Sequence, residues 1–377
     1  MPPVHIIDST LREGEQSALG HFSTDDKVAI ARALDEFGVD YLELSSPAAS
    51  FHSRHDAETI VGLNLSARTS AHVRCVVADV QAAIDVRVSA VRLYFGTSPV
   101  LRRASHGRTV EQILEAMVTP IDLALSAGLE THFSAEDAFR TEEDQLIRVV
   151  RAADRLGVHR VGLADTIGTA TPNEVYRLVS MVRGEVSCSV GFHGHNDTGC
   201  AVANAYEAVR AGASHVDVSV LGIGERVGIT PLGAFIARLI AARDTSLLGR
   251  YRLEQLASLE RLVADRLGIP IPFNNCVTGS TAFVHKSGTH IKAMLNDPES
   301  YEAIAPEPFG LHRTLIYASP LTGKHAVASR AEQLGLSLDE GQIAELTARV
   351  KELAHDHELT DAAFDQMLRK RGGSGSG

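Results

Sequence analysis

The chain has 377 residues, 44% of them hydrophobic, which is enough for one barrel of roughly 250 residues plus an appended region. Its 36 Lys and Arg are outnumbered by 47 Asp and Glu. The net charge of -11 gives no general electrostatic reason to bind nucleic acid or an anionic membrane. The four cysteines lack a CxxC spacing, which favours isolated thiols in a reducing compartment.

The N-terminal residues run into the apolar segment 4–7 without the basic and apolar stretches of an export signal. No apolar run approaches the roughly 18–20 residues that span a bilayer. We therefore expect a cytoplasmic protein with no membrane partner. Residues 372–377 read GGSGSG, the composition of a flexible linker.

Eight short β-rich runs recur along the chain, with helical patterns between them. They cover residues 4–9, 39–45, 69–75, 90–95, 129–134, 160–165, 187–193 and 215–221. Their starts are roughly 21 to 39 residues apart, which leaves room for a crossover helix in most units. Eight βα units close a parallel barrel, so the predicted fold class is α/β, a (β/α)8 TIM barrel.

Helix signals agree with this arrangement. Residues 24–26, Thr-Asp-Asp, precede an apolar face that includes Ile30 and Leu34, and Gly38 then stops the helix. A second pattern covers residues 142–156 and ends at Gly157, and residues 229–240 follow the eighth strand as the last barrel helix. The barrel domain is therefore predicted over residues 1–244.

A mainly helical C-terminal region is predicted over residues 245–371. It starts with a helix at 253–267, is interrupted by the Ile-Pro-Ile-Pro run at 269–272, and continues with amphipathic helices at 342–353 and 361–368. This region is too long to be only a tail. Residues 372–377 are excluded from it as the linker.

The active site of a TIM barrel lies at the C-terminal ends of the strands, and these ends are polar here. His193 and His195 are two residues apart on the seventh strand, so their rings project from one face, as two ligands of one metal require. Glu13, after the first strand, supplies an oxygen ligand suited to zinc, manganese, magnesium or iron. The alternatives are ordinary polar residues at a strand end and a solvated loop acid.

Three separated motifs carry a family resemblance. They are STLREGEQ at residues 9–16, HGHNDTGC at 193–200 and LGIGER at 221–226. The second region adds PFNN at 272–275, FVHKSGTH at 283–290, Tyr301 and LTG at 321–323. From about residue 6 to about residue 368, the chain resembles homocitrate synthases, which belong to a larger group of metal-dependent Claisen-condensing and lyase enzymes that includes isopropylmalate synthase.

This resemblance implies an acyltransferase. A divalent metal held by Glu13, His193 and His195 binds a 2-oxo acid, and acetyl-CoA, the co-substrate, attacks its carbonyl group. Hydrolysis of the thioester then gives a homocitrate-like 2-hydroxy tricarboxylate. Relatives are typically dimers whose second region reaches over the barrel mouth, so we expect a homodimer in which residues 245–371 act as a lid and dimerisation region.

The resemblance also assigns roles to single residues. His290, oriented by Glu136, is the expected base, and Tyr301 is a proton donor or positioner. Read alone, Glu136 also suits a helix N-terminus, and Tyr301 also suits a packed aromatic. Arg12 offsets charge near the keto oxygen and carboxylate. The positions that match substrate contacts are Arg12, Gln16, His72, Arg92, His132, Ser134 and Thr166, and Glu225 and Arg226 rank below them.

Three positions depart from the family pattern. Arg92 stands where homocitrate synthases usually have Asp, His132 where they have Arg, and Gly191 where they have Glu. The two lost acids receive the ammonium group of the inhibitor lysine in the family, so lysine should bind badly. One interpretation is a more anionic acceptor such as phosphonopyruvate, as in a 2-phosphonomethylmalate synthase. Another is an Asp/Arg exchange that grips 2-oxoglutarate from the opposite wall. A separate alternative for the reaction is a CoA-ester lyase of the same superfamily, although the retained His290 and Tyr301 favour condensation.

Overall fold

The computed structural model describes residues 4–243, 247–356 and 359–372. The chain forms two compact units, Met1–Ile271 and Pro272–Gly377. The boundary predicted at 244/245 lies outside the described residues, and the division falls later in the chain. The reason is that α11 (Leu256–Leu267) packs against α1 (Thr24–Phe37) and buries Leu256, Leu259 and Val263 in the first unit.

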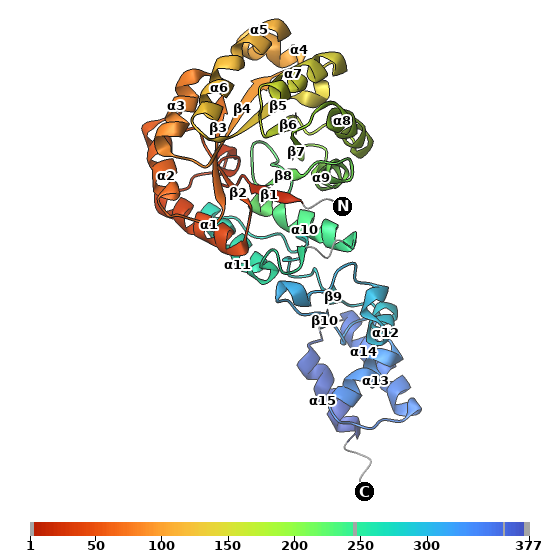
Figure 1. The fold of residues 1–377 in the computed structure, drawn as a ribbon. Helices are drawn as coiled ribbons and strands as arrows, with labels where there is room; N and C mark the ends of the chain where they lie inside the picture. The colour runs from red at the N-terminus through yellow and green to blue at the C-terminus, as the bar shows by residue number, and fades with distance from the viewer. Residues whose placement is uncertain (1–3, 244–246, 357–358, 373–377) are drawn as a thin grey trace. The chain divides into compact units, whose positions relative to one another are not determined.

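The first unit is a closed barrel of eight parallel strands in chain order, with the helices outside (Figure 1), which confirms the predicted fold. Pairing of the first and eighth strands, with His5 opposite His215, closes it. The strands are β1 (His5–Asp8), β2 (Tyr41–Leu44), β3 (Arg68–Arg74), β4 (Ala90–Gly96), β5 (Glu130–Glu136), β6 (Arg160–Asp165), β7 (Ser189–Gly194) and β8 (His215–Val218). The eighth strand is shorter than predicted because the chain turns at Val220–Gly222, where Leu221 has a φ of 57°.

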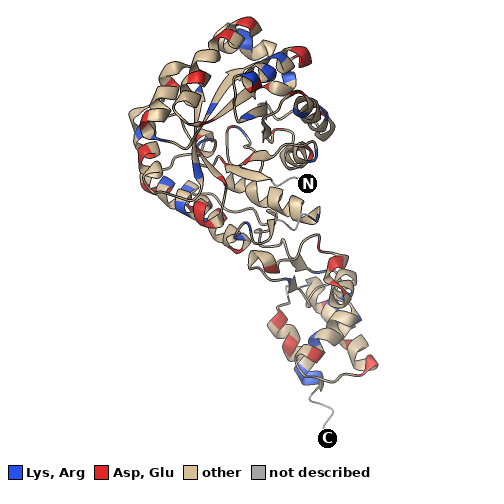
Figure 2. Ribbon diagram, viewed as in Figure 1, with Lys and Arg blue, Asp and Glu red and all other residues tan. Residues whose placement is uncertain are grey.

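The outer helices have local start and stop signals. Ser23 and Asp26 form a capping box at the start of α1, and Gly38 ends it with a φ of 100°. The other outer helices are α2 (Phe51–Val61), α3 (Val77–Val86), α4 (Pro99–Leu101), α5 (Val110–Ala116), α6 (Val118–Ser126), α7 (Glu143–Arg155), α8 (Pro172–Glu185), α9 (Ala201–Arg210) and α10 (Leu232–Ala241). Residues of opposite charge are interspersed over these helices (Figure 2), as in the pair of Arg177 on α8 with Glu143 on α7.

The strands alternate between an apolar outer face and a polar inner face, and this positions the site. Leu93, Phe133 and Phe192 are fully buried, and the alternation directs them toward the helices. Their strand neighbours, including Arg92 and His193, face the barrel axis. The interior is therefore polar, and its acids and bases have to satisfy one another.

The second unit is mainly helical, as predicted. Its short parallel pair, β9 (Val284–His285) with β10 (Thr314–Leu315), accompanies α12 (Gly288–Asn296), α13 (Lys324–Gln333), α14 (Glu340–Asp356) and α15 (Asp361–Gly372). Ile291, Val327, Val350 and Phe364 form its core. Gly372 is the last residue of α15, which shortens the predicted linker at its start, and residues 373–377 lie outside the described part.

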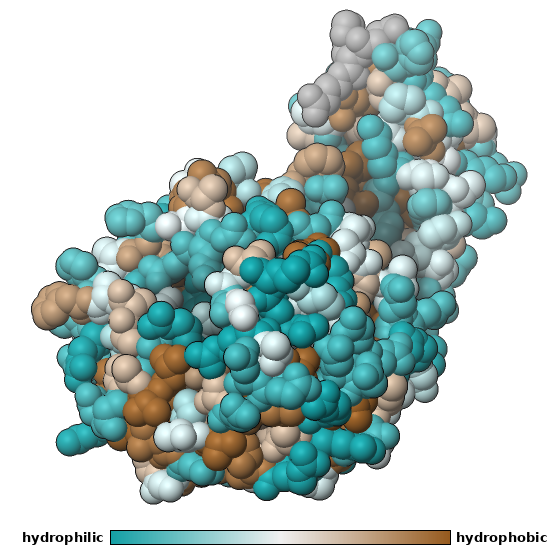
Figure 3. All heavy atoms as spheres, turned by 90° about the horizontal axis from the view of Figure 1, so that it is seen from above, coloured by the Kyte–Doolittle hydropathy of each residue, from teal (hydrophilic) through white to brown (hydrophobic). Residues whose placement is uncertain are grey.

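Hydrophilic side chains cover most of the barrel face drawn in Figure 3, and apolar ones form scattered groups. Within the described ranges, none of the helices combines the length and the apolar character needed to cross a membrane.

Candidate metal centre and active site

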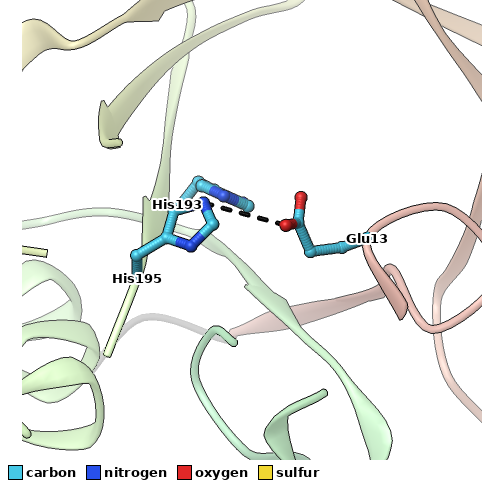
Figure 4. A group of neighbouring side chains, drawn as sticks. All are labelled: Glu13, His193 and His195. Carbon is cyan, nitrogen blue, oxygen red and sulfur yellow. Dashed lines mark ion pairs between the residues drawn. The ribbon is translucent and has the colours of Figure 1, made fainter. Parts of the chain in front are cut away.

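Three side chains that are far apart in the sequence meet at the C-terminal end of the barrel. Glu13 lies in the turn after β1, His193 near the end of β7, and His195 just after β7. All three are buried, and one ligand atom from each lies within 4.8 Å of the others. Figure 4 shows both imidazole rings and the carboxylate converging on one point.

Neighbouring groups orient each of these side chains. His193 Nδ1 lies 3.0 Å from the Asp217 carboxylate, which leaves Nε2 for a metal. The Glu13 carboxylate accepts a hydrogen bond from the Glu225 backbone N–H at 3.0 Å and pairs with Arg12. The chain passes close to Glu13 at Gly224, where a Cβ atom would lie 2.8 Å from Glu13 Cγ.

The protonation states fit metal binding. Burial alone would raise the pKa of Glu13, but the nearby Arg12 and the two histidines lower it to about 2. Burial, reinforced by His193, lowers the pKa of His195 to about 3. At neutral pH the carboxylate is therefore anionic and this imidazole neutral, as metal ligands must be. His195 Nδ1 is buried and has no hydrogen-bond partner in the described structure, and its Nε2 lies 3.8 Å from Glu13. Two imidazoles and one carboxylate thus fit a divalent metal.

A cavity of about 290 Å³ opens beside this cluster. This volume is at the lower end of the range of small-molecule sites. Nearly all the predicted first-unit site residues line it: Arg12, Glu13, Gln16, His72, Arg92, Ser134, Glu136, Thr166, His193 and His195. The lower-ranked Glu225 and Arg226 line it too, together with Tyr94 and Ala164, which the sequence analysis did not single out.

Arg12 is held at the cavity by an acid that the sequence analysis missed. The guanidinium donates to Glu43 Oε2 from Nε at 2.9 Å and from Nη2 at 2.7 Å. Ser9 donates to the same oxygen at 2.6 Å. Glu43 is fully buried in β2, and an acid within an otherwise apolar strand run is the signal that could have identified it.

Arg92 is neutralised by a second missed acid. Its guanidinium donates to both carboxylate oxygens of Asp217, at 2.5 and 2.7 Å, and lies 2.9 Å from Glu43. Asp217 also orients His193, so the metal site and Arg92 share one carboxylate. The positive charge of Arg92 is therefore balanced inside the barrel.

His132 does not line the large cavity, contrary to its predicted place at the barrel mouth. It comes two residues before Ser134 on β5 and so lies one layer deeper along the barrel axis. Its Nε2 lies 2.7 Å from Glu130, and Arg160 Nη2 donates to its Nδ1 at 2.5 Å. Burial, followed by the nearby Arg160, lowers the pKa of His132 to about 3, so it is neutral.

Other polar groups face the cavity from neighbouring strands. Thr166 Oγ1 accepts a hydrogen bond from the Asp137 backbone N–H at 2.9 Å, which leaves its own hydroxyl proton available. His72 stacks on Tyr94 with ring centroids 4.5 Å apart. Burial raises the pKa of Glu136, and Asp137 raises it further, so this carboxylate is poised to take a proton.

His290 and Tyr301 lie in the second unit, where the structure brings them together. Their rings stack with centroids 3.9 Å apart, and Tyr301 is 48% exposed. Beside them Glu302 is held by Arg313 at 2.6 Å and lies 3.3 Å from His285. His290 and Tyr301, two groups that can carry protons, are thus paired on this unit.

Comparisons with known families match both units. A family model described as HMGL-like matches residues 3–263. A second model, described as homocitrate synthase post-HMGL domain-like, matches residues 277–358.

Curated relatives match nearly the whole chain. The mitochondrial homocitrate synthase of Schizosaccharomyces pombe is 49% identical over 97% of this chain and 87% of its own length. The cytosolic isozyme of Saccharomyces cerevisiae is 46% identical over 97% and 85%. Among solved structures, an HMG-CoA lyase of Bacillus subtilis aligns with a TM-score of 0.65 at 21% identity, over 72% of this chain and 96% of its own, which concerns the fold alone.

Proposed function

Because the chain belongs to the homocitrate synthase family, we propose that it condenses acetyl-CoA with 2-oxoglutarate and hydrolyses the thioester to release homocitrate. The enzyme is an acetyl-CoA-dependent acyltransferase. One observation carries the proposal most strongly: the buried cluster of Glu13, His193 and His195 opens into a cavity that Arg12 also lines. A metal-bound 2-oxo acid needs this combination of ligands and fixed positive charge.

Glu13, His193 and His195 would hold the divalent metal, which acts as a Lewis acid on the keto group of the acceptor when bound. Arg12, fixed by Glu43, directs a guanidinium group toward the charge that develops on the keto oxygen. The Thr166 hydroxyl donates to the acceptor's carboxylate next to the keto group. Ser134 and Gln16 provide further polar contacts, and His72 lies near the far end of the acceptor.

Removing a proton from the methyl group of acetyl-CoA requires a placed base, because this carbon acid is far too weak for an unassisted step at neutral pH. We assign His290 as that base, oriented by Glu136, with Tyr301 delivering or positioning a proton. The stacking of His290 on Tyr301 and the raised pKa of Glu136 support these roles. In this proposal residues 245–371 act as the lid and dimerisation region, so the pair serves a barrel of its own chain or of a partner in a homodimer.

Neither phosphonopyruvate as the acceptor nor the lyase reaction is favoured. The argument for phosphonopyruvate depends on the positive charge of Arg92, and this charge is paired with Asp217 and Glu43. The lyase is disfavoured because the HMG-CoA lyase structure is only 21% identical to this chain, whereas curated homocitrate synthases are 46–49% identical. The two homocitrate synthases of Saccharomyces cerevisiae are described as mitochondrial and as cytosolic, so the cytoplasmic location of this protein stays a prediction.

The decisive experiment supplies acetyl-CoA, a divalent metal and single 2-oxo acids, and follows free CoA thiol. We expect release with 2-oxoglutarate and homocitrate in the product by mass spectrometry. His193→Ala should lose bound metal and turnover together, measured by metal analysis and the same thiol assay. If none of the 2-oxo acids led to release of CoA, or if the enzyme kept full activity after metal removal, the proposal would be contradicted.

A further inference from the structure

Arg160 is a buried cation that forms no ion pair within the described part of the chain. Only 2% of its surface is exposed, and it forms no ion pair with any carboxylate in residues 4–243, 247–356 and 359–372. The groups around it are either neutral or already paired with other residues. Nη2 donates to the neutral His132, and the guanidinium lies 5.2 Å from the centre of the Tyr41 ring. Its Nη1 is buried and has no hydrogen-bond partner in the described structure.

The other charges in the barrel interior balance without Arg160. Arg12 and Arg92 are matched by Glu43 and Asp217, and Glu13 is left for the metal. Glu130, another acid that acts on Arg160, pairs with Arg68 and with the neutral His132. A buried, unmatched charge is strongly destabilising unless an opposite charge pairs with it. The partner that Arg160 requires is therefore an anion.

A narrow cavity gives an anion access to Arg160. It is lined by Arg160, His132 and Gly191, and it shares Arg92, Ser134 and His193 with the large cavity above. The volume of this cavity is about 10 Å³. That is room for one water molecule or for one carboxylate oxygen.

Gly191 keeps this space open. A Cβ atom at this position would lie 3.2 Å from Arg160 Cδ. The Arg160 side chain therefore lies directly against the bare backbone of β7. Gly191 is two residues before His193 on the same strand, which places it about 7 Å deeper at roughly 3.3 Å per residue.

We propose that Arg160 is the specificity-determining residue for the far end of the acceptor, donating through Nη1 to the distal acid group of a dicarboxylic 2-oxo acid. The proposal rests on the proposed function and deepens it. In an extended five-carbon acceptor the keto and distal carboxyl carbons are about 4 Å apart, and an oxygen at each end brings the span to roughly 6 Å. This matches the depth between His193 and Gly191. The distal oxygen replaces a water molecule and supplies the missing counter-charge.

The test compares kcat/KM for 2-oxoglutarate with kcat/KM for 2-oxopentanoate, which has the same chain length and no distal acid. Arg160→Met should lower the ratio of these two values by about 10- to 100-fold, the worth of one charge-assisted hydrogen bond. Arg68→Met is the matched control. Arg68 faces the same Tyr41 ring at 5.7 Å and pairs with Glu130, but its side chain is 52% exposed and lies outside the narrow cavity. Its ratio should stay at the wild-type value.

Gly191→Glu provides a second test if Arg160→Met does not fold. A carboxylate introduced beside Arg160 takes the place of the distal acid, so the preference for 2-oxoglutarate should fall in the same way. A ratio unchanged in a folded Arg160→Met or Gly191→Glu enzyme would overturn the inference, because a purely structural arginine affects both acceptors equally.

Binding separates this inference from the reaction itself. With Mg²⁺ present, 2-oxoglutarate should raise the wild-type Tm more than 2-oxopentanoate does, and Arg160→Met should lose this difference while Arg68→Met keeps it. If wild-type enzyme binds both acids in this way but releases no CoA, the proposed function fails and the inference stands. If the two acids raise the wild-type Tm equally, the inference fails.

Discussion

Asp217 links the candidate metal site to the charge balance of the barrel, and its replacement by Asn tests both. The carboxylate orients His193 Nδ1 at 3.0 Å and accepts two hydrogen bonds from Arg92 at 2.5 and 2.7 Å. Asn has nearly the same shape but no charge, and its amide group opposes a donor of Arg92. The variant therefore removes the counter-charge without removing volume.

Two magnitudes follow for Asp217→Asn. Breaking a buried ion pair on one side costs about 3–5 kcal/mol. Arg92 keeps its contact with Glu43 at 2.9 Å, so the lower end, about 3 kcal/mol, applies. Loss of the carboxylate behind a metal-binding histidine lowers metal affinity by about 10- to 100-fold, or roughly 1.4–2.7 kcal/mol.

Denaturant unfolding of metal-free protein measures the loss of folding stability. A competition titration of Zn²⁺ against a chelator measures the loss of metal affinity. Glu143→Gln is the control, since it breaks an exposed pair with Arg177 on the outer helices and should cost less than about 1 kcal/mol. Wild-type metal affinity in a folded Asp217→Asn protein would refute the role given to Asp217 in orienting His193.

Three further outcomes are expected. Gly224→Ala places a Cβ atom 2.8 Å from Glu13 Cγ and should weaken metal binding in the same titration, whereas Gly184→Ala, whose Cβ meets nothing within 4 Å on helix α8, should bind metal normally. For Asp40, burial opposes ionisation, but hydrogen bonds from His5, the Ile6 N–H, Tyr251 and Arg250 lower its pKa from 3.8 to about 2. Its contribution to stability is therefore present above about pH 4 and lost as the pH falls toward 2, so urea midpoints of wild type and Asp40→Asn should converge over that range. Lysine at millimolar concentration should leave turnover unchanged, because Arg92 and Gly191 offer its ammonium group no acid. Competitive inhibition by lysine would show that this expectation is wrong.

Much of the fold could be predicted because its signals are local. Each β-rich run reports its own strand, and the capping residues Ser23 and Gly38 are adjacent to the helix that they bound. The grouping of His193 with His195 is also local, since two residues on one strand share a face. Glu13 joined them in the prediction only through the rule that all strand ends of a parallel barrel meet at one rim.

The boundary between the two units was harder to predict, because it depends on contacts between segments that are far apart in the sequence. Helix α11 has an ordinary amphipathic pattern, which says that it packs but not on what. Its attachment to α1 depends on a surface formed more than two hundred residues earlier. Only the folded chain assigns it to the barrel unit.

What the sequence by itself determined is thus the barrel, the rim where the candidate site lies and the residue types that suit a metal. The tertiary structure decided which charges cancel. Arg92 and Asp217 are 125 residues apart, and they meet because the closed barrel brings β4 and β8 to face each other across its interior. The same closure leaves Arg160 without a carboxylate partner among the described residues, and it places His132 beneath the large cavity. A charge balance in a low-dielectric interior depends on distances between all groups at once, and no local pattern in a sequence contains those distances.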